Sequence, residues 1–136
     1  SAFAAAVLAV DVDPDVFNDF DRSEVDCILA DVRVGLKFLR PGCIDTAFTN
    51  PPFGTKNNAG IDALFVKAAM SVSPRCYSLH KSSCRQKLVK KLTSTVDGHE
   101  CSVLAEMSFD LPKQYRFHKE DCISIAVDLL KTERVE

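Results

Sequence analysis

The amino-acid sequence predicts an α/β fold with a mostly parallel sheet that is closed by an antiparallel terminal strand. Short apolar runs alternate with helical patterns over the first two thirds of the chain, and two longer strand-like runs follow near its end. The 136 residues, 46% of them hydrophobic, are enough for one domain with a core. No apolar run approaches the roughly 20 residues of a membrane span. The net charge of −2 excludes a general attraction to nucleic acid, so such binding requires a local patch.

Local signals support each element. After the first strand, Asp13 is suited to cap a helix and Pro14 to occupy its first position. Apolar residues recur with helical spacing from Ile61 to Ala69, and alternate residues are apolar from Ile123 to Leu129. The predicted order is strand 7–10, helix 15–20, strand 25–32, strand 44–49, helix 61–69, strand and exit loop 75–83, helix 84–92, strand 101–111 and strand 122–130.

Polar residues stand where four of these strands end, namely Asp11, Asp31, Asn50 and His80. Ligands of open α/β sheets bind beyond the carboxyl ends of the strands, so this edge is the predicted site. Asp11 stands where a carboxylate binds both ribose hydroxyls of a nucleotide-like cofactor, or else it caps the helix. Asp31 either contacts an adenine ring, together with Val32, or forms an ordinary turn. For His80 we favour a positioning or structural role over a catalytic one.

The segment Asn50-Pro51-Pro52-Phe53 ends a strand with residues that cannot continue it. Proline has no backbone N–H and a fixed φ, so the chain leaves the sheet and stays rigid there. The Asn50 side-chain oxygen and a proline carbonyl can accept two hydrogen bonds from one amino group, and Phe53 can stack on the ring that carries it. Such a rim activates a flat, amino-bearing nucleophile without a strong base. The alternative is a proline turn with Phe53 in the core.

The cysteines indicate neither a disulfide framework nor a metal centre. No two are close enough for a CxxC pair, and the three histidines fall at no ligand-like spacing. We therefore expect reduced, structural cysteines in a cytosolic or nuclear protein. The six are Cys27, Cys43, Cys76, Cys84, Cys101 and Cys122.

Three stretches, "NPPFGTKNNAGIDALFVKAA", "YSLHKSS" and "FDLPKQYRFHK", resemble the methyltransferase-like protein 5 family. The resemblance extends from Val7 to Leu130. It implies a class I Rossmann-like fold and an S-adenosylmethionine-dependent enzyme that forms N6-methyladenosine in small-subunit ribosomal RNA. It also implies a cytoplasmic and nuclear, including nucleolar, location. A small zinc-binding activator protein is expected to pair with the edge strand 25–32.

The same resemblance assigns roles to the residues at the strand ends. Asp11 is expected to bind the cofactor ribose, and Asp31 with Val32 its adenosine end. The catalytic motif that receives the target adenine consists of Asn50, Pro51, Pro52 and Phe53.

Two departures from the family pattern accompany these matches. In the family, a first strand and a glycine-rich loop precede the position of Val7, and neither is found in these 136 residues. That strand is expected between strands 7–10 and 44–49, so its absence predicts two unpaired inner edges. The connection between Asp13 and Val25 is also several residues shorter than in the family. We therefore expect a partial methyltransferase domain over residues 1–136 that is inactive by itself.

Two basic clusters are candidates for RNA binding. The first follows strand 75–80 and is either an RNA surface or a solvated helix face. The second mixes cations with aromatic rings, as binders of single-stranded RNA do, unless its rings close the core. The RNA-binding residues predicted from both clusters are Lys81, Arg85, Tyr115, Arg116, Phe117 and Lys119.

Four functions remain open at this point. The leading interpretation is an RNA adenine-N6 methyltransferase. The same motif also occurs in guanine-N2 RNA methyltransferases and, with tyrosine in place of phenylalanine, in protein-glutamine methyltransferases. A non-catalytic fragment that binds a partner or RNA is the alternative of another class.

Overall fold

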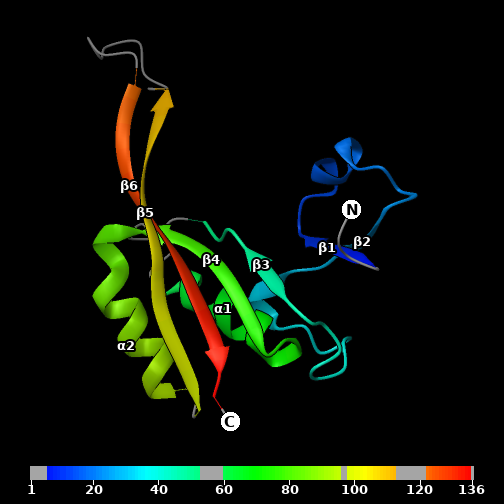
Figure 1. Cartoon of the computed structure of the whole chain (residues 1–136). Helices are drawn as coiled ribbons and strands as arrows, with labels where there is room; N and C mark the ends of the chain where they lie inside the picture. Colours follow the sequence, from blue (N-terminus) through cyan, green and yellow to red (C-terminus); the bar gives the residue numbers. More distant parts are fainter. Residues whose placement is uncertain (1–5, 53–59, 96–97, 113–121, 136) are drawn as a thin grey trace.

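The computed structural model describes residues 6–52, 60–95, 98–112 and 122–135, and Figure 1 shows their arrangement. The elements in chain order are β1 (Val7–Asp11), η1 (Pro14–Asp19), β2 (Val25–Leu29), η2 (Val32–Val34), β3 (Ala47–Thr49), α1 (Ile61–Val72), β4 (Arg75–Lys81), η3 (Ser82–Cys84), α2 (Arg85–Thr95), β5 (His99–Pro112) and β6 (Cys122–Arg134). The η elements are short 3₁₀ helices.

The strands form two separate sheets. β1 and β2 pair in parallel, with Val7 opposite Val25. The larger sheet has the order β3-β4-β6-β5, in which β3 and β4 are parallel and β6 runs antiparallel to both of its neighbours. The predicted mixed sheet with an antiparallel final strand is therefore confirmed. Among the described residues no ladder joins β1 to β3, so both inner edges are unpaired, as the position of the family's first strand predicts.

The hydrophobic core lies between the larger sheet and its two helices (Figure 1). Val66 and Met70 of α1 and Leu88 and Leu92 of α2 pack with Leu130 of β6 in one buried cluster. Burial of these aliphatic side chains is the main stabilising contribution, at about 25 cal/mol per Å² of apolar surface removed from water.

Several elements differ from the predicted bounds for local reasons. Helix 15–20 is a 3₁₀ helix, although Asp13 caps it as predicted, accepting the Asp15 N–H at 2.9 Å. β2 ends at Leu29, because the following Asp31 caps η2. β3 begins only at Ala47, since the Ile44 N–H donates to the Val72 carbonyl at the end of α1 (3.0 Å) and not to a strand.

The ends of β5 and β6 project together beyond the rest of the sheet as an arm (Figure 1). Both strands are longer than predicted, because their pairing continues from His99–Arg134 to Pro112–Cys122. In the part of the chain that the structure describes, no helix has the length and apolarity needed to cross a bilayer. Nor do the described His, Cys, Asp and Glu side chains form any group of three that could hold a metal ion.

Candidate functional site

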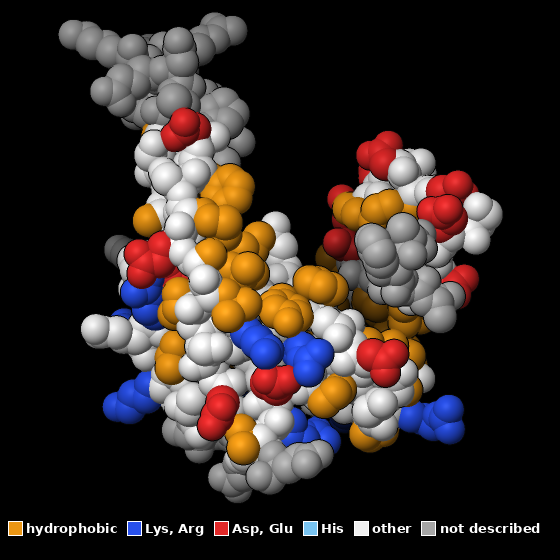
Figure 2. Space-filling view, viewed as in Figure 1, with side chains coloured by type: hydrophobic (Ala, Val, Ile, Leu, Met, Phe, Trp, Pro, Cys, Tyr) orange, Lys and Arg blue, Asp and Glu red, His pale blue; other side chains and the backbone are white. Residues whose placement is uncertain are grey.

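A cleft of about 740 Å³ opens at the carboxyl ends of β1, β2 and β3. Its lining comes from both sheets and from the first two turns of α1, and Figure 2 shows hydrophobic side chains gathered on the face between the β5–β6 arm and the β1–β2 unit. The lining residues are Val10, Asp11, Val12, Ala30, Asp31, Val32, Arg33, Asn50, Pro51, Pro52, Ile61, Phe65, Leu79, Phe109, Ile125 and Val127.

The cleft brings together six residues that the sequence singled out. They come from three different strand ends, and they are Asp11, Asp31, Val32, Asn50, Pro51 and Pro52. Within the proline rim, Asn50 is exposed, Pro51 is buried and Pro52 is exposed, so the turn anchors itself through its middle residue. Phe53 lies outside the described residues.

Asp11 is held in a tight turn at the end of β1. Its Oδ1 accepts the Asp13 N–H at 2.9 Å. The cap of the following helix is Asp13 and not Asp11, so the capping interpretation of Asp11 is wrong. A carboxylate fixed at a strand end and lining a cleft is suited to accept hydrogen bonds from two vicinal hydroxyls.

Asp31 accepts a backbone hydrogen bond in a similar turn, but its carboxylate also pairs with the charged side chain of Arg33. Its Oδ1 accepts the Arg33 N–H at 2.9 Å, and the Arg33 guanidinium donates to both carboxylate oxygens, at distances from 2.7 to 3.1 Å. These hydrogen bonds hold the pKa of Asp31 below its usual value. Asp31 is therefore both a turn residue, as one interpretation predicts, and part of the cleft wall with Val32.

His80 is not part of this cleft, which corrects the expectation that four polar strand ends share one rim. Its side chain lies on the other face of β4, beneath α1, and the residue is 2% exposed. Burial lowers the pKa of His80 to about 4, against the opposing influence of Asp62 and Asp128. At neutral pH the imidazole is uncharged.

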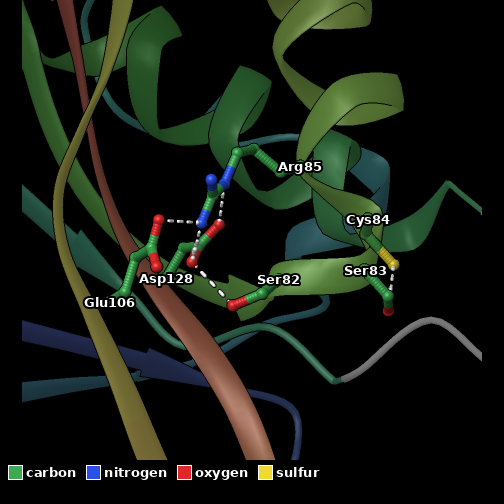
Figure 3. A network of polar contacts seen from close by, with 6 residues as sticks. All are labelled: Ser82, Ser83, Cys84, Arg85, Glu106 and Asp128. Carbon is green, nitrogen blue, oxygen red and sulfur yellow. Dashed lines mark hydrogen bonds and ion pairs between the residues drawn. The ribbon is translucent and has the colours of Figure 1, made fainter.

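An ion pair with the buried carboxylate of Asp128 joins β6 to η3 and to the start of α2 (Figure 3). Asp128 of β6 is 1% exposed and accepts two hydrogen bonds from Arg85, from Nε at 2.6 Å and from the terminal nitrogen at 2.7 Å. The Ser82 hydroxyl donates to the same carboxylate at 2.6 Å. The hydrogen bonds from Arg85 are the main reason why the pKa of Asp128 is lowered. This network fixes the exit of β4 and the first residue of α2 to the centre of the sheet.

The predicted RNA-binding residues are only partly described. Arg85 is held by Asp128 and also by Glu106 at 2.6 Å, so two carboxylates compensate its charge. Lys81 is the half-buried last residue of β4. Tyr115, Arg116, Phe117 and Lys119 lie outside the described residues.

Two features of this region were not predicted from the sequence. One is the apolar wall that Leu79, Phe109 and Val127 contribute to the cleft; its signal was the alternation of apolar residues in the last strand. The other is the Asp128–Arg85 pair. An aspartate inside the apolar run "IAVDLL" requires a buried partner, which was the available clue.

This arrangement of strands, with carboxylates at two strand ends and a proline rim at the third, is of the class I methyltransferase type. Solved structures support that class. A proposed RNA methyltransferase from Pyrococcus horikoshii superposes with a TM-score of 0.73 at 26% identity, covering 98% of this chain and 65% of that one. A Thermoplasma acidophilum protein gives 0.63 at 27% identity, covering 96% and 67%. The 23S rRNA methyltransferase ErmE, at 12% identity, shares the fold alone.

Sequence comparison identifies the particular relatives. The rRNA N(6)-adenosine-methyltransferase metl-5 of Caenorhabditis elegans is 38% identical over 141 residues, which cover 96% of this chain and 65% of the relative. METTL5 of Danio rerio is 35% identical, with 94% and 64% covered. No protein-family model matches the chain. The chain is thus homologous, over nearly all of its own length, to the METTL5 rRNA N(6)-adenosine-methyltransferases, and it spans somewhat less than two thirds of theirs.

Proposed function

We propose that the protein is an S-adenosylmethionine-dependent methyltransferase that acts on N6 of an adenosine in small-subunit ribosomal RNA. The observation that carries the proposal is one cleft lined both by Asn50, Pro51 and Pro52 and by Asp11 and Asp31. Homology to enzymes named rRNA N(6)-adenosine-methyltransferases supports the same substrate class. A ribosomal RNA substrate would place the protein in the cytoplasm and in the nucleus, including the nucleolus.

The residues present fit the cofactor. The Asp11 carboxylate is held by a backbone hydrogen bond at the end of β1, where it can accept hydrogen bonds from both ribose hydroxyls. Val32 and the apolar residues Val10 and Val12 also line the cleft and can contact the adenine ring of the cofactor. When bound, S-adenosylmethionine supplies an electrophilic methyl group.

The chain's own residues prepare the nucleophile. The Asn50 side-chain oxygen and the Pro51 carbonyl are proposed to accept hydrogen bonds from the two N–H groups of the target adenine, while Phe53 stacks on its ring. Accepting both hydrogens draws the nitrogen toward tetrahedral geometry and makes its lone pair available for attack. The buried Pro51 keeps this rim rigid, which is the preorganisation that such electrostatic catalysis requires.

RNA binding is proposed for Lys81 and for the segment with Tyr115, Arg116, Phe117 and Lys119. This segment joins the two strands of the arm, and the arm contributes Phe109 and Ile125 to the cleft. Arg85 is proposed to act by holding the start of α2 rather than by contacting phosphate, because two carboxylates already bind it.

The small zinc-binding activator protein is proposed to bind the outer edge of β2. Among the described residues β2 pairs only with β1, so its other edge is open to another strand. Three hydrophobic side chains on and after this strand are strongly exposed: Leu29 (61%), Val34 (74%) and Phe38 (50%). An open edge beside exposed apolar residues favours β-augmentation by a partner.

The proposal is tested by methylation of small-subunit ribosomal RNA with the full-length protein and its activator, followed by mass spectrometry of the nucleosides. We expect N6-methyladenosine. Formation of N2-methylguanosine, or of methylglutamine on ribosomal proteins, would instead favour one of the related activities.

A non-catalytic role is the second candidate, and the two separate sheets favour it for residues 1–136 taken alone. Without a bridging strand, the carboxylates of the smaller sheet are poorly fixed relative to Asn50. RNA binding by the 136-residue chain with no methylated product would support this alternative.

A further inference from the structure

His80 is a buried histidine whose hydrogen-bonding capacity is unused. Neither Nδ1 nor Nε2 has a hydrogen-bond partner in the part of the chain that the structure describes, and the side chain is 1% exposed. Burying a polar group without a partner destabilises a fold, so each such group in a native structure requires an explanation.

Two carboxylates face this histidine, and they differ in their partners. Asp128, opposite His80 in the β4–β6 ladder, is held by Arg85 and Ser82. Asp62, in the first turn of α1, binds only its neighbour's N–H among the described hydrogen bonds, from Ala63 at 2.9 Å. The distance from His80 Nδ1 to Asp62 Oδ2 is 3.8 Å, which exceeds hydrogen-bond range by less than 1 Å.

The residues beside this gap lead directly to the cleft. Ile61, which precedes Asp62, and Phe65, one turn later, both line the cleft. On the neighbouring strand, Thr49 pairs with Ser78, and two residues further along each chain stand the buried Pro51 and His80. His80 therefore lies behind both the proline rim and the first turn of α1.

We propose that His80 is a positioning residue for methyl transfer, and that its Nδ1–H donates a hydrogen bond to Asp62 when the target nucleotide binds. This inference rests on the proposed function. Hydrogen bonds of active sites are often long without substrate and shorten in the complex. Closing the gap would move the start of α1, which carries Ile61 in its first turn and Phe65 in its second, toward the sheet that carries Asn50. A misplacement of about 1 Å at a reacting group can cost on the order of 100-fold in rate.

The test uses the full-length protein with its activator and ribosomal RNA. His80→Phe fills the same space without polar atoms, His80→Asn keeps an N–H near the position of Nδ1, and Asp62→Ala removes the acceptor. The matched control is Ser78→Ala, since the Ser78 hydroxyl is equally buried, equally without a partner and on the same face of β4. The measurements are kcat, the KM values for cofactor and RNA, and the melting temperature.

We expect His80→Phe to lower kcat by about 10- to 100-fold, with the KM for cofactor within about twofold and the melting temperature unchanged or higher. His80→Asn should restore most of the activity, and Ser78→Ala should leave it unchanged. Adding Asp62→Ala to His80→Phe should cause little further loss, because both changes remove one interaction.

The outcomes separate this proposal from the proposed function. Absence of methylation by the wild-type protein overturns the proposed function, and this inference with it. An active wild type whose His80→Phe variant retains kcat within twofold overturns the role of His80 alone. His80→Phe could be inactive and also unfold at a lower temperature than the wild type. In that case, a His80→Asn variant that is equally inactive overturns the proposal. So does a loss of activity from Asp62→Ala that adds fully to the loss from His80→Phe in the double variant.

Discussion

The two sheets of this protein differ in how well they are supported. The larger sheet is covered on one face by α1 and α2, and all but one of the buried hydrophobic side chains described belong to this unit. The exception is Phe17, which packs beneath Phe20 and the Arg22 guanidinium in the smaller β1–β2 unit. Asn50 thus stands on the supported unit, whereas Asp11 and Asp31 stand on the other.

The two halves of the proposed site therefore depend on different parts of the fold: Asn50 on the larger sheet, and Asp11 and Asp31 on the smaller one. The rim proposed to receive the target stands on the unit that holds the main hydrophobic cluster. The carboxylates proposed to hold the cofactor need something that fixes β1 and β2 to the larger sheet.

The largest effect is expected for cofactor binding by residues 1–136 alone. Asp11 is proposed as one anchor, and the 136 residues contain no glycine-rich loop that would bring backbone N–H groups to the cofactor. Losing a few hydrogen bonds of about 1 kcal/mol each, together with preorganisation, should weaken binding by several orders of magnitude. Calorimetry with S-adenosylmethionine measures this. Micromolar binding by the monomeric 136-residue chain would show that the two sheets are fixed to each other without further support.

A pair of core truncations tests the contrast in stability. Leu130→Ala should lower the free energy of unfolding by about 2–5 kcal/mol, because Leu130 is fully buried in the main cluster. Phe17→Ala should leave the larger sheet nearly unchanged and accelerate amide exchange in β1 and β2 only. Hydrogen exchange of residues 1–136 distinguishes the two. Equal protection losses in both sheets after Phe17→Ala would mean that they unfold as one unit.

His80 gives the supported unit a dependence on pH. Its pKa in the folded state, about 4, is below the usual 6.5, so the unfolded state binds more protons between these values. The free energy of unfolding should therefore be at its full value above about pH 6.5. It should fall by roughly 2–3 kcal/mol as the pH drops toward 4. The difference in unfolding free energy between wild type and His80→Phe, measured from pH 7.5 to 4.5, isolates this effect from the carboxylates. A difference independent of pH would contradict it.

The smallest effect concerns RNA and leaves both sheets intact. Charge reversal at Arg116 and Lys119 should weaken RNA binding by about tenfold or more at moderate salt and flatten its dependence on salt, because fewer counterions are released. Affinity for the cofactor should not change. Titrations of the full-length protein with RNA at several salt concentrations measure both. If affinity and slope stay the same, the segment joining β5 and β6 is structural.

The sequence predicted the order of elements and six residues of the cleft, because those depend on local signals. Strand ends carry polar residues, and prolines end a ladder wherever they occur. The prediction from sequence was wrong where contacts between distant segments determine the structure. The Ile44 N–H bonds to the end of α1 and not to a strand. The His80 side chain lies on the helix-covered face of the sheet, although His80 stands near the end of a strand like the other three polar residues. Alternation along a strand specifies which residues share a face, but not which face meets the cleft.

Asn50 is proposed to act on the target and not on the cofactor, and the variant Asn50→Ala of the full-length protein separates these two roles. The matched control is Asn18→Ala, an exposed asparagine of the smaller unit. We predict that Asn50→Ala lowers kcat on ribosomal RNA by about 100-fold or more, while the Kd for S-adenosylmethionine stays within about twofold. Turnover within a few-fold of wild type would contradict the account.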